Sequence, residues 1–317
     1  MNHIEEIKNT HKNPVVYTTI GAFDGIHIGH QQLIQSMINQ AKSDQKETLV
    51  ITFDPHPAVV LKSLPMPFYI TSPIEKDYIL RQLGINHILT LKFDRELASL
   101  EPEEFMDLVM QDYQIEQLWL GKDFALGKNR SGNLSVLGDI GKHKGFKIIE
   151  NQHIEDKGNK VSSSIIRKWI QEGNFADTKK ALNRYYSIQG QVAHGDSRGK
   201  GLGFPTANLD VWEGKLLPTP GVYATWITID DIIFSSVTNV GYRPTFENQI
   251  IIPRTEVHIL NFDRDIYNHQ VQLHFVEQLR TEIKFNSIEA LVNQISKDKR
   301  RAEEILKNAT KPSDLFT

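Results

Sequence analysis

Two histidines lie three residues apart in the segment Gly21–His30, which has the sequence GAFDGIHIGH. The segment falls between an expected strand and an expected helix, so His27 and His30 stand at a helix start and can project toward one point. The glycines permit a tight turn, and the free N–H groups of a helix start favour an anion. Two imidazoles placed there could stabilise the oxygens of a phosphate under attack. The alternative is a glycine-rich turn with two incidental histidines.

A second segment, Val161–Arg167, has the sequence VSSSIIR and favours the same kind of ligand. Ser162, Ser163 and Ser164 place three hydroxyl groups at the start of an expected helix. Serines in this position cap unpaired N–H groups, and capping alone would explain them. Arg167, one turn inside, adds a fixed cation whose planar fork suits bidentate contact with phosphate.

The second half of the chain carries the segment Gly195–Asn208, with the sequence GDSRGKGLGFPTAN. Thr206 and Asn208 are alternate residues, so they lie on one face of an extended segment. Both offer hard oxygen atoms, which suit Mg²⁺ shared with the phosphates of ATP. A loop rich in glycine can fold over phosphates, and four glycines precede these residues: Gly195, Gly199, Gly201 and Gly203.

In the first half, short β-branched runs alternate with amphipathic stretches, which predicts a parallel sheet with both faces covered by helices. Ligands of such sheets gather at the carboxyl ends of the strands, where the first motif is expected. The expected strands are Val15–Ile20, Leu49–Phe53, His87–Phe93, Gln117–Leu120 and Phe146–Ile149. The expected helices are Gln31–Ala41, Ile74–Leu83, Pro102–Gln111 and Leu134–His143.

After about Tyr185 the rhythm changes to closely spaced strands, which predicts an antiparallel barrel or sandwich. These strands are Ser187–Ala193, Val222–Ile229, Ile232–Val237, Glu256–Leu260 and Val271–Phe275. Ser287 is expected to cap a final helix whose buried stripe is Ile288, Leu291, Ile295, Ala302, Ile305 and Leu306.

The change of rhythm predicts two domains, residues 1–184 and 185–317. We expect the first to be a Rossmann-like α/β domain, and of barrel and sandwich we expect the second to be a β-barrel with a C-terminal helix.

Composition excludes several classes of protein. The 317 residues carry a formal net charge of -3, so there is no basic excess for binding nucleic acid. The absence of cysteine excludes disulfides, thiolate zinc sites and cysteine nucleophiles. The start of the sequence shows no signal peptide, and no run of residues is long enough to span a membrane. We therefore expect a cytoplasmic protein with small-molecule ligands, either a monomer or a transient homo-oligomer.

Taken together, the first two segments resemble the signatures of the nucleotidylyltransferase superfamily. With FDPHP at Phe53–Pro57 and LGKDFALGKNRSG at Leu120–Gly132, they resemble the adenylylating module of the bacterial bifunctional riboflavin kinase/FAD synthetase family. The resemblance implies that His27, His30 and Arg167 act in catalysis. It also implies that ATP is bound by Gly21, Phe23, Asp24, Gly25, Gly29, Asp123, Ser162, Ser163 and Ser164.

The glycine-rich segment ending in PTAN resembles the riboflavin kinase signature of the same family. The likeness continues through PGVYA at Pro220–Ala224, NVGYRPTF at Asn239–Phe246 and RTEVHIL at Arg254–Leu260. It implies that Glu256 is the catalytic base, and a base is needed because the riboflavin 5′-hydroxyl is neutral at pH 7. Flavin contacts are expected from Asn239, Arg243, Thr245 and Arg280, and nucleotide contacts from the four glycines named above.

The resemblance implies that riboflavin and ATP give FMN and ADP, and that FMN and ATP then give FAD and pyrophosphate, both with Mg²⁺. Three alternatives stay open. The chain could be a kinase with an inactive first module, since Ala125 stands where the family often has a longer polar residue. It could adenylylate a different phosphate ester. It could also be a non-catalytic, flavin-binding regulator.

Overall fold

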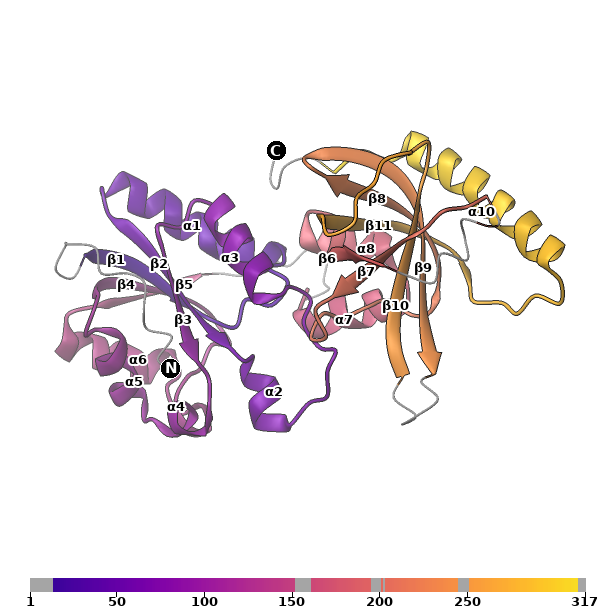
Figure 1. Ribbon diagram of the computed structural model, residues 1–317. Helices are drawn as coiled ribbons and strands as arrows, with labels where there is room; N and C mark the ends of the chain where they lie inside the picture. The colour runs from indigo at the N-terminus through magenta and orange to yellow at the C-terminus, as the bar shows by residue number, and fades with distance from the viewer. Residues whose placement is uncertain (1–13, 152–160, 195–200, 202, 245–250, 313–317) are drawn as a thin grey trace. The chain divides into compact units, whose positions relative to one another are not determined.

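The computed structural model describes residues 14–151, 161–194, 201, 203–244 and 251–312, and it divides the chain into two compact units (Figure 1). The first unit comprises Met1–Leu64 and Pro73–Lys160, and the second comprises Pro65–Ser72 and Val161–Thr317. The described part of the chain contains no helix with both the length and the apolar character needed to cross a bilayer.

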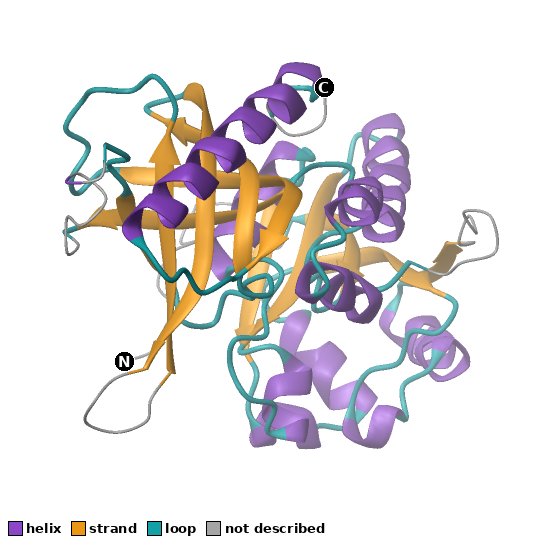
Figure 2. Ribbon diagram, turned by 90° about the vertical axis from the view of Figure 1, so that its right-hand side faces the viewer, coloured by secondary structure: helices purple, strands orange, loops and turns teal. Residues whose placement is uncertain are grey.

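The first unit is a five-stranded parallel sheet in the order β3-β2-β1-β4-β5, with helices on both faces (Figures 1 and 2). Its strands are β1 (Val15–Ile20), β2 (Glu47–Asp54), β3 (His87–Lys92), β4 (Gln114–Gly121) and β5 (Lys147–Asn151). Its helices are α1 (Ile28–Ser43), α2 (Pro57–Lys62), α3 (Pro73–Gln82), α4 (Arg95–Ser99), α5 (Pro102–Val109), the 3₁₀ helix η1 (Lys128–Arg130) and α6 (Leu134–Lys144). The predicted parallel α/β sheet is therefore confirmed.

The strand order creates a switch point between β1 and β4. From β1 the chain moves outward through β2 and β3, and it then returns to place β4 on the other side of β1. Loops that leave neighbouring strands in opposite directions open a crevice at their carboxyl ends, where ligands of such sheets bind. The segment Gly21–His30 follows β1 directly and so lies at this point.

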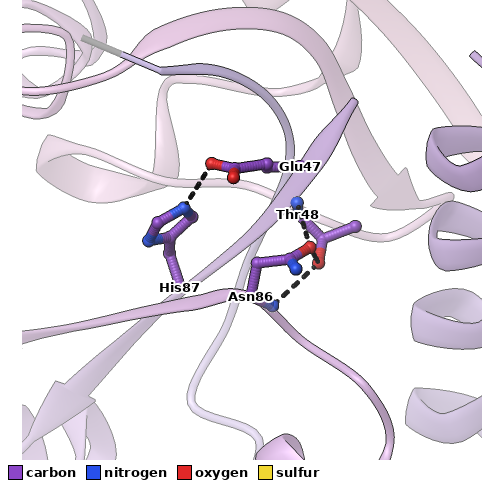
Figure 3. A network of polar contacts seen from close by, with 4 residues as sticks. All are labelled: Glu47, Thr48, Asn86 and His87. Atoms are coloured by element: carbon purple, nitrogen blue, oxygen red, sulfur yellow. Dashed lines mark hydrogen bonds and ion pairs between the residues drawn. The ribbon is translucent and has the colours of Figure 1, made fainter. Parts of the chain in front are cut away.

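A polar network fastens the opposite, amino ends of β2 and β3 (Figure 3). The side-chain oxygen of Asn86 accepts hydrogen bonds from the backbone N–H and the hydroxyl of Thr48, at 2.9 and 2.8 Å. The His87 ring lies 2.7 Å from the carboxylate of Glu47. The network fixes the register of β2 and β3 at the amino edge of the sheet. It lies opposite the carboxyl edge, where the loop with the two histidines begins.

The second unit contains a closed antiparallel barrel in the order β10-β7-β6-β11-β8-β9, which confirms the predicted barrel with its C-terminal helix. Its strands are β6 (Tyr186–Ala193), β7 (Ala207–Val211), β8 (Gly221–Ile229), β9 (Ile232–Pro244), β10 (Ile251–Ile259) and β11 (Gln270–Thr281). The helices are α7 (Ser163–Gln171), α8 (Phe175–Leu182) and α10 (Ile288–Asn308). Alternate residues of β6 point inward, and aromatic rings of Phe175, Tyr223 and Phe275 pack together in the core.

Helix α10 packs on the barrel through its second half. Ser287 caps it as predicted, accepting a hydrogen bond from the N–H of Ala290 at 3.1 Å. The buried residues of this helix are Asp298, Ala302 and Leu306. Ile288 is 63% exposed, so the predicted stripe is wrong at its first position, because the first turn lies outside the region of the helix that contacts the strands.

One buried histidine makes the barrel unit sensitive to acid. His274 on β11 lies 3.1 Å from the hydroxyl of Thr228, and burial lowers its pKa to about 4. The unfolded chain therefore binds more protons than the folded chain between pH 4 and 6.5. We expect full stability above about pH 6.5 and a progressive loss, on the order of 3 kcal/mol, as the pH falls through the folded pKa. Urea unfolding at several pH values measures this, and His274→Gln should flatten the dependence.

Candidate active sites

The segment after β1 is a strained turn at the carboxyl edge of the sheet. The N–H of Gly21 donates to the carbonyl of Ile51 at 3.0 Å, and the N–H of Ile26 returns to the carbonyl of Phe23 at 3.3 Å. Phe23 and Ile26 have φ values of 49° and 41°. A positive φ is unfavourable for a β-branched residue and persists only where the surroundings enforce it. Ile26 is fully buried, so packing enforces it here.

The turn delivers the two histidines to the start of α1. Their rings stack with centroids 3.8 Å apart and planes inclined by 18°, and the edge of Phe23 meets the His30 ring at 5.1 Å. His27 is the N-cap of this 16-residue helix, whose first turn holds no acidic residue. A Cβ on Gly29 would lie 3.3 Å from the His27 ring, so glycine leaves room for the stack. Two imidazoles and a positive helix end can hold anionic oxygens.

Two acidic residues predicted to contact ATP lie at the same edge of the sheet. Asp24 lies within it and is 3% exposed. Asp123 is exposed and follows β4, the strand beside β1 across the switch point. Its carbonyl accepts a hydrogen bond from Arg130 at 3.1 Å. Both residues therefore come from loops at the carboxyl edge of the sheet, as the prediction requires.

The serine-rich segment starts α7, which groups with the second unit. Ser162 caps the helix by accepting a hydrogen bond from the N–H of Ile165 at 3.4 Å, so it performs at least the capping role. Arg167 donates from Nε to the carbonyl of Phe68 at 3.0 Å, and its guanidinium lies 3.8 Å from the centre of the Phe68 ring. The histidines belong to the first unit. That the two groups meet at one phosphate stays a prediction.

The barrel brings three predicted residues into one row. Glu256 on β10 pairs with Asn208 on β7 and with Asn239 on β9. Directly opposed residues of antiparallel strands point to the same face and lie within reach of each other. Thr206 is exposed and immediately precedes β7. The amide and carboxylate groups expected from the sequence thus occupy one face of the barrel wall. That the Thr206 hydroxyl joins them stays a prediction.

Sequence reasoning missed the residue that links this row. The Nε of Arg254 lies 2.8 Å from the Glu256 carboxylate and 3.0 Å from the side-chain oxygen of Asn208. Arg254 stands two residues before Glu256, and this spacing in a strand could have signalled a shared face. Two residues after Glu256, the ring of His258 lies 2.8 Å from the carbonyl of Pro205 and fastens the PTAN segment to β10. The side chain of Glu256 is 28% exposed.

The oxygen donors of this row fit Mg²⁺. Mg²⁺ is usually held by one or two protein oxygens together with waters and substrate phosphates, rather than by a cage of protein carboxylates. The hydroxyl of Thr206 and the amide oxygen of Asn208 are hard donors of the required kind.

The structure describes only some of the remaining residues predicted to line the barrel site. Gly195, Gly199 and Thr245 lie outside the described residues, as does the side chain of Arg243, whose backbone pairs with Ile252. Gly201 has open space around it, and Gly203 has a φ of +83° that favours glycine. Arg280 donates to the buried carboxylate of Asp298 at 2.9 Å and so ties β11 to α10. Its contact with flavin stays a prediction.

Comparison with known proteins matches both halves of the chain. Residues 9–165 match the family model of FAD synthetase, and residues 182–306 match that of riboflavin kinase. A bifunctional riboflavin kinase/FMN adenylyltransferase of Bacillus subtilis is 34% identical over 295 residues, which cover 92% of this chain and 93% of the relative. The protein of the same description in Escherichia coli K12 is 32% identical over 297 residues, 93% of this chain and 94% of the relative.

One solved structure is similar over nearly the whole chain. It is described as a macrolide-efflux protein from Streptococcus pneumoniae, with a TM-score of 0.84 and 29% identity, covering 94% of this chain and 96% of that one. The two family models and the curated relatives agree in naming a kinase and an adenylyltransferase. The chain belongs to the family of bifunctional riboflavin kinases/FMN adenylyltransferases.

Proposed function

We propose that this chain makes FAD from riboflavin in two ATP-dependent steps with different catalytic needs. Riboflavin is first phosphorylated to FMN by a domain spanning residues 185–317, and FMN is then adenylylated to FAD by a domain spanning residues 1–184. The kinase and adenylyltransferase activities follow from family membership. The observation that carries the division of labour is the row of Asn208, Glu256 and Asn239, which offers a carboxylate beside hard oxygen donors.

In the kinase step, Glu256 accepts the proton of the riboflavin 5′-hydroxyl as that oxygen attacks the γ-phosphorus of ATP. Arg254 holds the carboxylate in place. Thr206 and Asn208 would hold Mg²⁺, which neutralises charge on the ATP phosphates when bound. We assign nucleotide contacts to Gly195, Gly199, Gly201 and Gly203, and flavin contacts to Asn239, Arg243, Thr245 and Arg280.

The adenylyl step needs no base, because the phosphate of FMN is already an ionised nucleophile. An FMN oxygen attacks the α-phosphorus of ATP, and pyrophosphate leaves. His27 and His30, with the start of α1, stabilise the charge that develops on the α-phosphate oxygens. We assign further phosphate contacts to Ser162, Ser163, Ser164 and Arg167. The turn residues Gly21, Phe23, Asp24, Gly25 and Gly29 and the loop residue Asp123 complete the proposed ATP site.

ATP is a substrate of both steps, which supports a cytoplasmic location for the protein. We propose that it acts as a monomer or a transient homo-oligomer on small molecules alone, without nucleic acid as a partner. The formal net charge of -3 agrees with the last point, because a phosphate-binding surface for nucleic acid needs a basic excess.

A product time course tests this function. The protein is incubated with riboflavin, ATP and Mg²⁺, and flavins are separated by chromatography while ADP and pyrophosphate are measured. We expect FMN to appear first, followed by FAD with one pyrophosphate released for each FAD formed. FMN without FAD or pyrophosphate would mean that only the kinase half is active. Binding of flavin without any product would favour a regulator.

A further inference from the structure

Helix α3 buries a lysine beneath the strained turn of the adenylyl site. Lys76 is only 7% exposed, and lysines are rarely buried unless partners hold the ammonium group. Its Nζ donates to the hydroxyl of Thr52 at 2.9 Å and to the carbonyls of Phe53 at 3.2 Å and Ala22 at 3.4 Å. Thr52 in turn donates to the same Ala22 carbonyl at 3.2 Å. One cation thus joins the carboxyl ends of β1 and β2.

These contacts use the full donor capacity of the lysine. An ammonium group has three N–H donors and no acceptor, and three acceptors surround it. A nucleotide phosphate could therefore accept a hydrogen bond from Lys76 only if one of these contacts broke. The geometry makes Lys76 a positioning residue rather than a group that touches the substrate.

The positive charge of Lys76 also acts on the turn, through the carboxylate of Asp24. Burial lowers its pKa, while the carboxylates of Asp24 and Asp54 raise it. Asp24, in the turn itself, is 3% exposed. A buried carboxylate that loses its neighbouring cation is strongly destabilised. Removing the ammonium would take from the Ala22 carbonyl one of the two donors named above, leaving the hydroxyl of Thr52, and would favour movement of Asp24 toward water. We expect the turn between these residues and His27 to relax as a result.

We propose that Lys76 is a positioning residue for adenylyl transfer, holding the turn after β1 so that His27 and His30 stand stacked at the start of α1. The strain at Phe23 and Ile26 agrees with this role, because unfavourable φ values persist only where several contacts enforce them. The inference rests on the proposed adenylyl site at the two histidines. It adds a residue that neither sequence motif contains.

The test compares two variants on the same helix. Lys76→Met should lower kcat for FAD formation from FMN by about 100-fold, the typical effect of a misplaced catalytic group. Riboflavin phosphorylation should stay unchanged and serves as the folding control for the second unit. Arg81→Met is the matched control, since Arg81 is exposed and paired with Asp77 at 2.7 Å, and both of its activities should match the wild type.

Two further readouts separate positioning from mere support of the fold. In NMR spectra, the ring signals of His27 and His30 should shift in Lys76→Met, while those of His87, at the amino edge of the sheet, should not. The chain has no cysteine, so Lys76→Cys can be alkylated uniquely. Alkylation with 2-bromoethylamine, which restores an ammonium group at nearly the same length, should recover most of the lost activity, whereas alkylation with iodoacetamide should not.

A folded Lys76→Met protein with adenylylation within threefold of wild type, or with unmoved His27 and His30 signals, would overturn the inference. If that variant does not fold, Lys76→Gln takes its place, since it keeps a donor without the charge, and the same outcomes apply. Failure of the proposed function itself would look different. In that case the wild-type protein would make no FAD, or His30→Ala would leave FAD formation unchanged.

Discussion

Glu256→Ala should reduce FMN formation from riboflavin by about 100- to 10,000-fold, because the 5′-hydroxyl must then lose its proton without a general base. Glu256→Gln should show nearly the same loss. Glutamine keeps the length of the side chain and can accept a hydrogen bond from Arg254, so its effect isolates the missing base from the lost ion pair. Initial rates of FMN and ADP production measure both variants.

FAD formation from supplied FMN should stay near the wild-type rate in both Glu256 variants, since the adenylyl step needs no base. Glu277→Gln is a suitable control, because this glutamate is also on a barrel strand but pairs with Arg301 at the surface. Equal loss of the two reactions in Glu256→Gln would show that the activities are assigned to the wrong domains.

His30→Ala should reduce adenylyl transfer by about 100- to 1,000-fold, the typical effect of removing one donor that stabilises transition-state charge. His30 stacks on His27, so the substitution also leaves the remaining ring without its neighbour. The measurement is pyrophosphate release with FMN and ATP as substrates. Riboflavin phosphorylation by the same variant should be unchanged.

His143→Ala controls for the loss of a histidine from the same unit, since His143 lies in the last turn of α6. It should leave both reactions at the wild-type rate. A fall in FMN production by His30→Ala, with normal pyrophosphate release from FMN, would mean that the site after β1 serves the kinase instead.

The sequence predicted the strands of the parallel sheet and helices α1, α3, α5 and α6 because each of them carries a local pattern. The short helices α2 and α4 were not predicted. The strand pattern by itself does not distinguish a barrel from a sandwich, since inward and outward residues alternate with a period of two in both. Closure of the barrel depends on pairing between β10 and β7, whose residues Glu256 and Asn208 are distant in the chain. The exposure of Ile288 escaped prediction for a similar reason, because helical periodicity does not reveal where a neighbouring strand ends.

Contacts in the two sites divide in the same way. Those between residues close in the sequence were predictable, and those between residues far apart in the sequence were not. His27 and His30 were predictable as neighbours because one helical turn relates them. Lys76 was not, because a lysine in an amphipathic helix usually faces water, and its partners Thr52 and Ala22 are 24 and 54 residues away in the chain. Arg254 belonged to a recognised motif, but its contact with Asn208 spans 46 residues and two strands.

A mixture of the Glu256→Gln and His30→Ala variants tests most directly whether phosphorylation and adenylylation take place at two separate sites. Glu256→Gln cannot supply FMN, and His30→Ala cannot convert FMN to FAD, so neither should make FAD from riboflavin, ATP and Mg²⁺. The account predicts that the mixture does make FAD, because FMN released by His30→Ala diffuses to the intact adenylyl site of Glu256→Gln. A mixture that accumulates no FAD, although Glu256→Gln converts supplied FMN normally, would contradict the account.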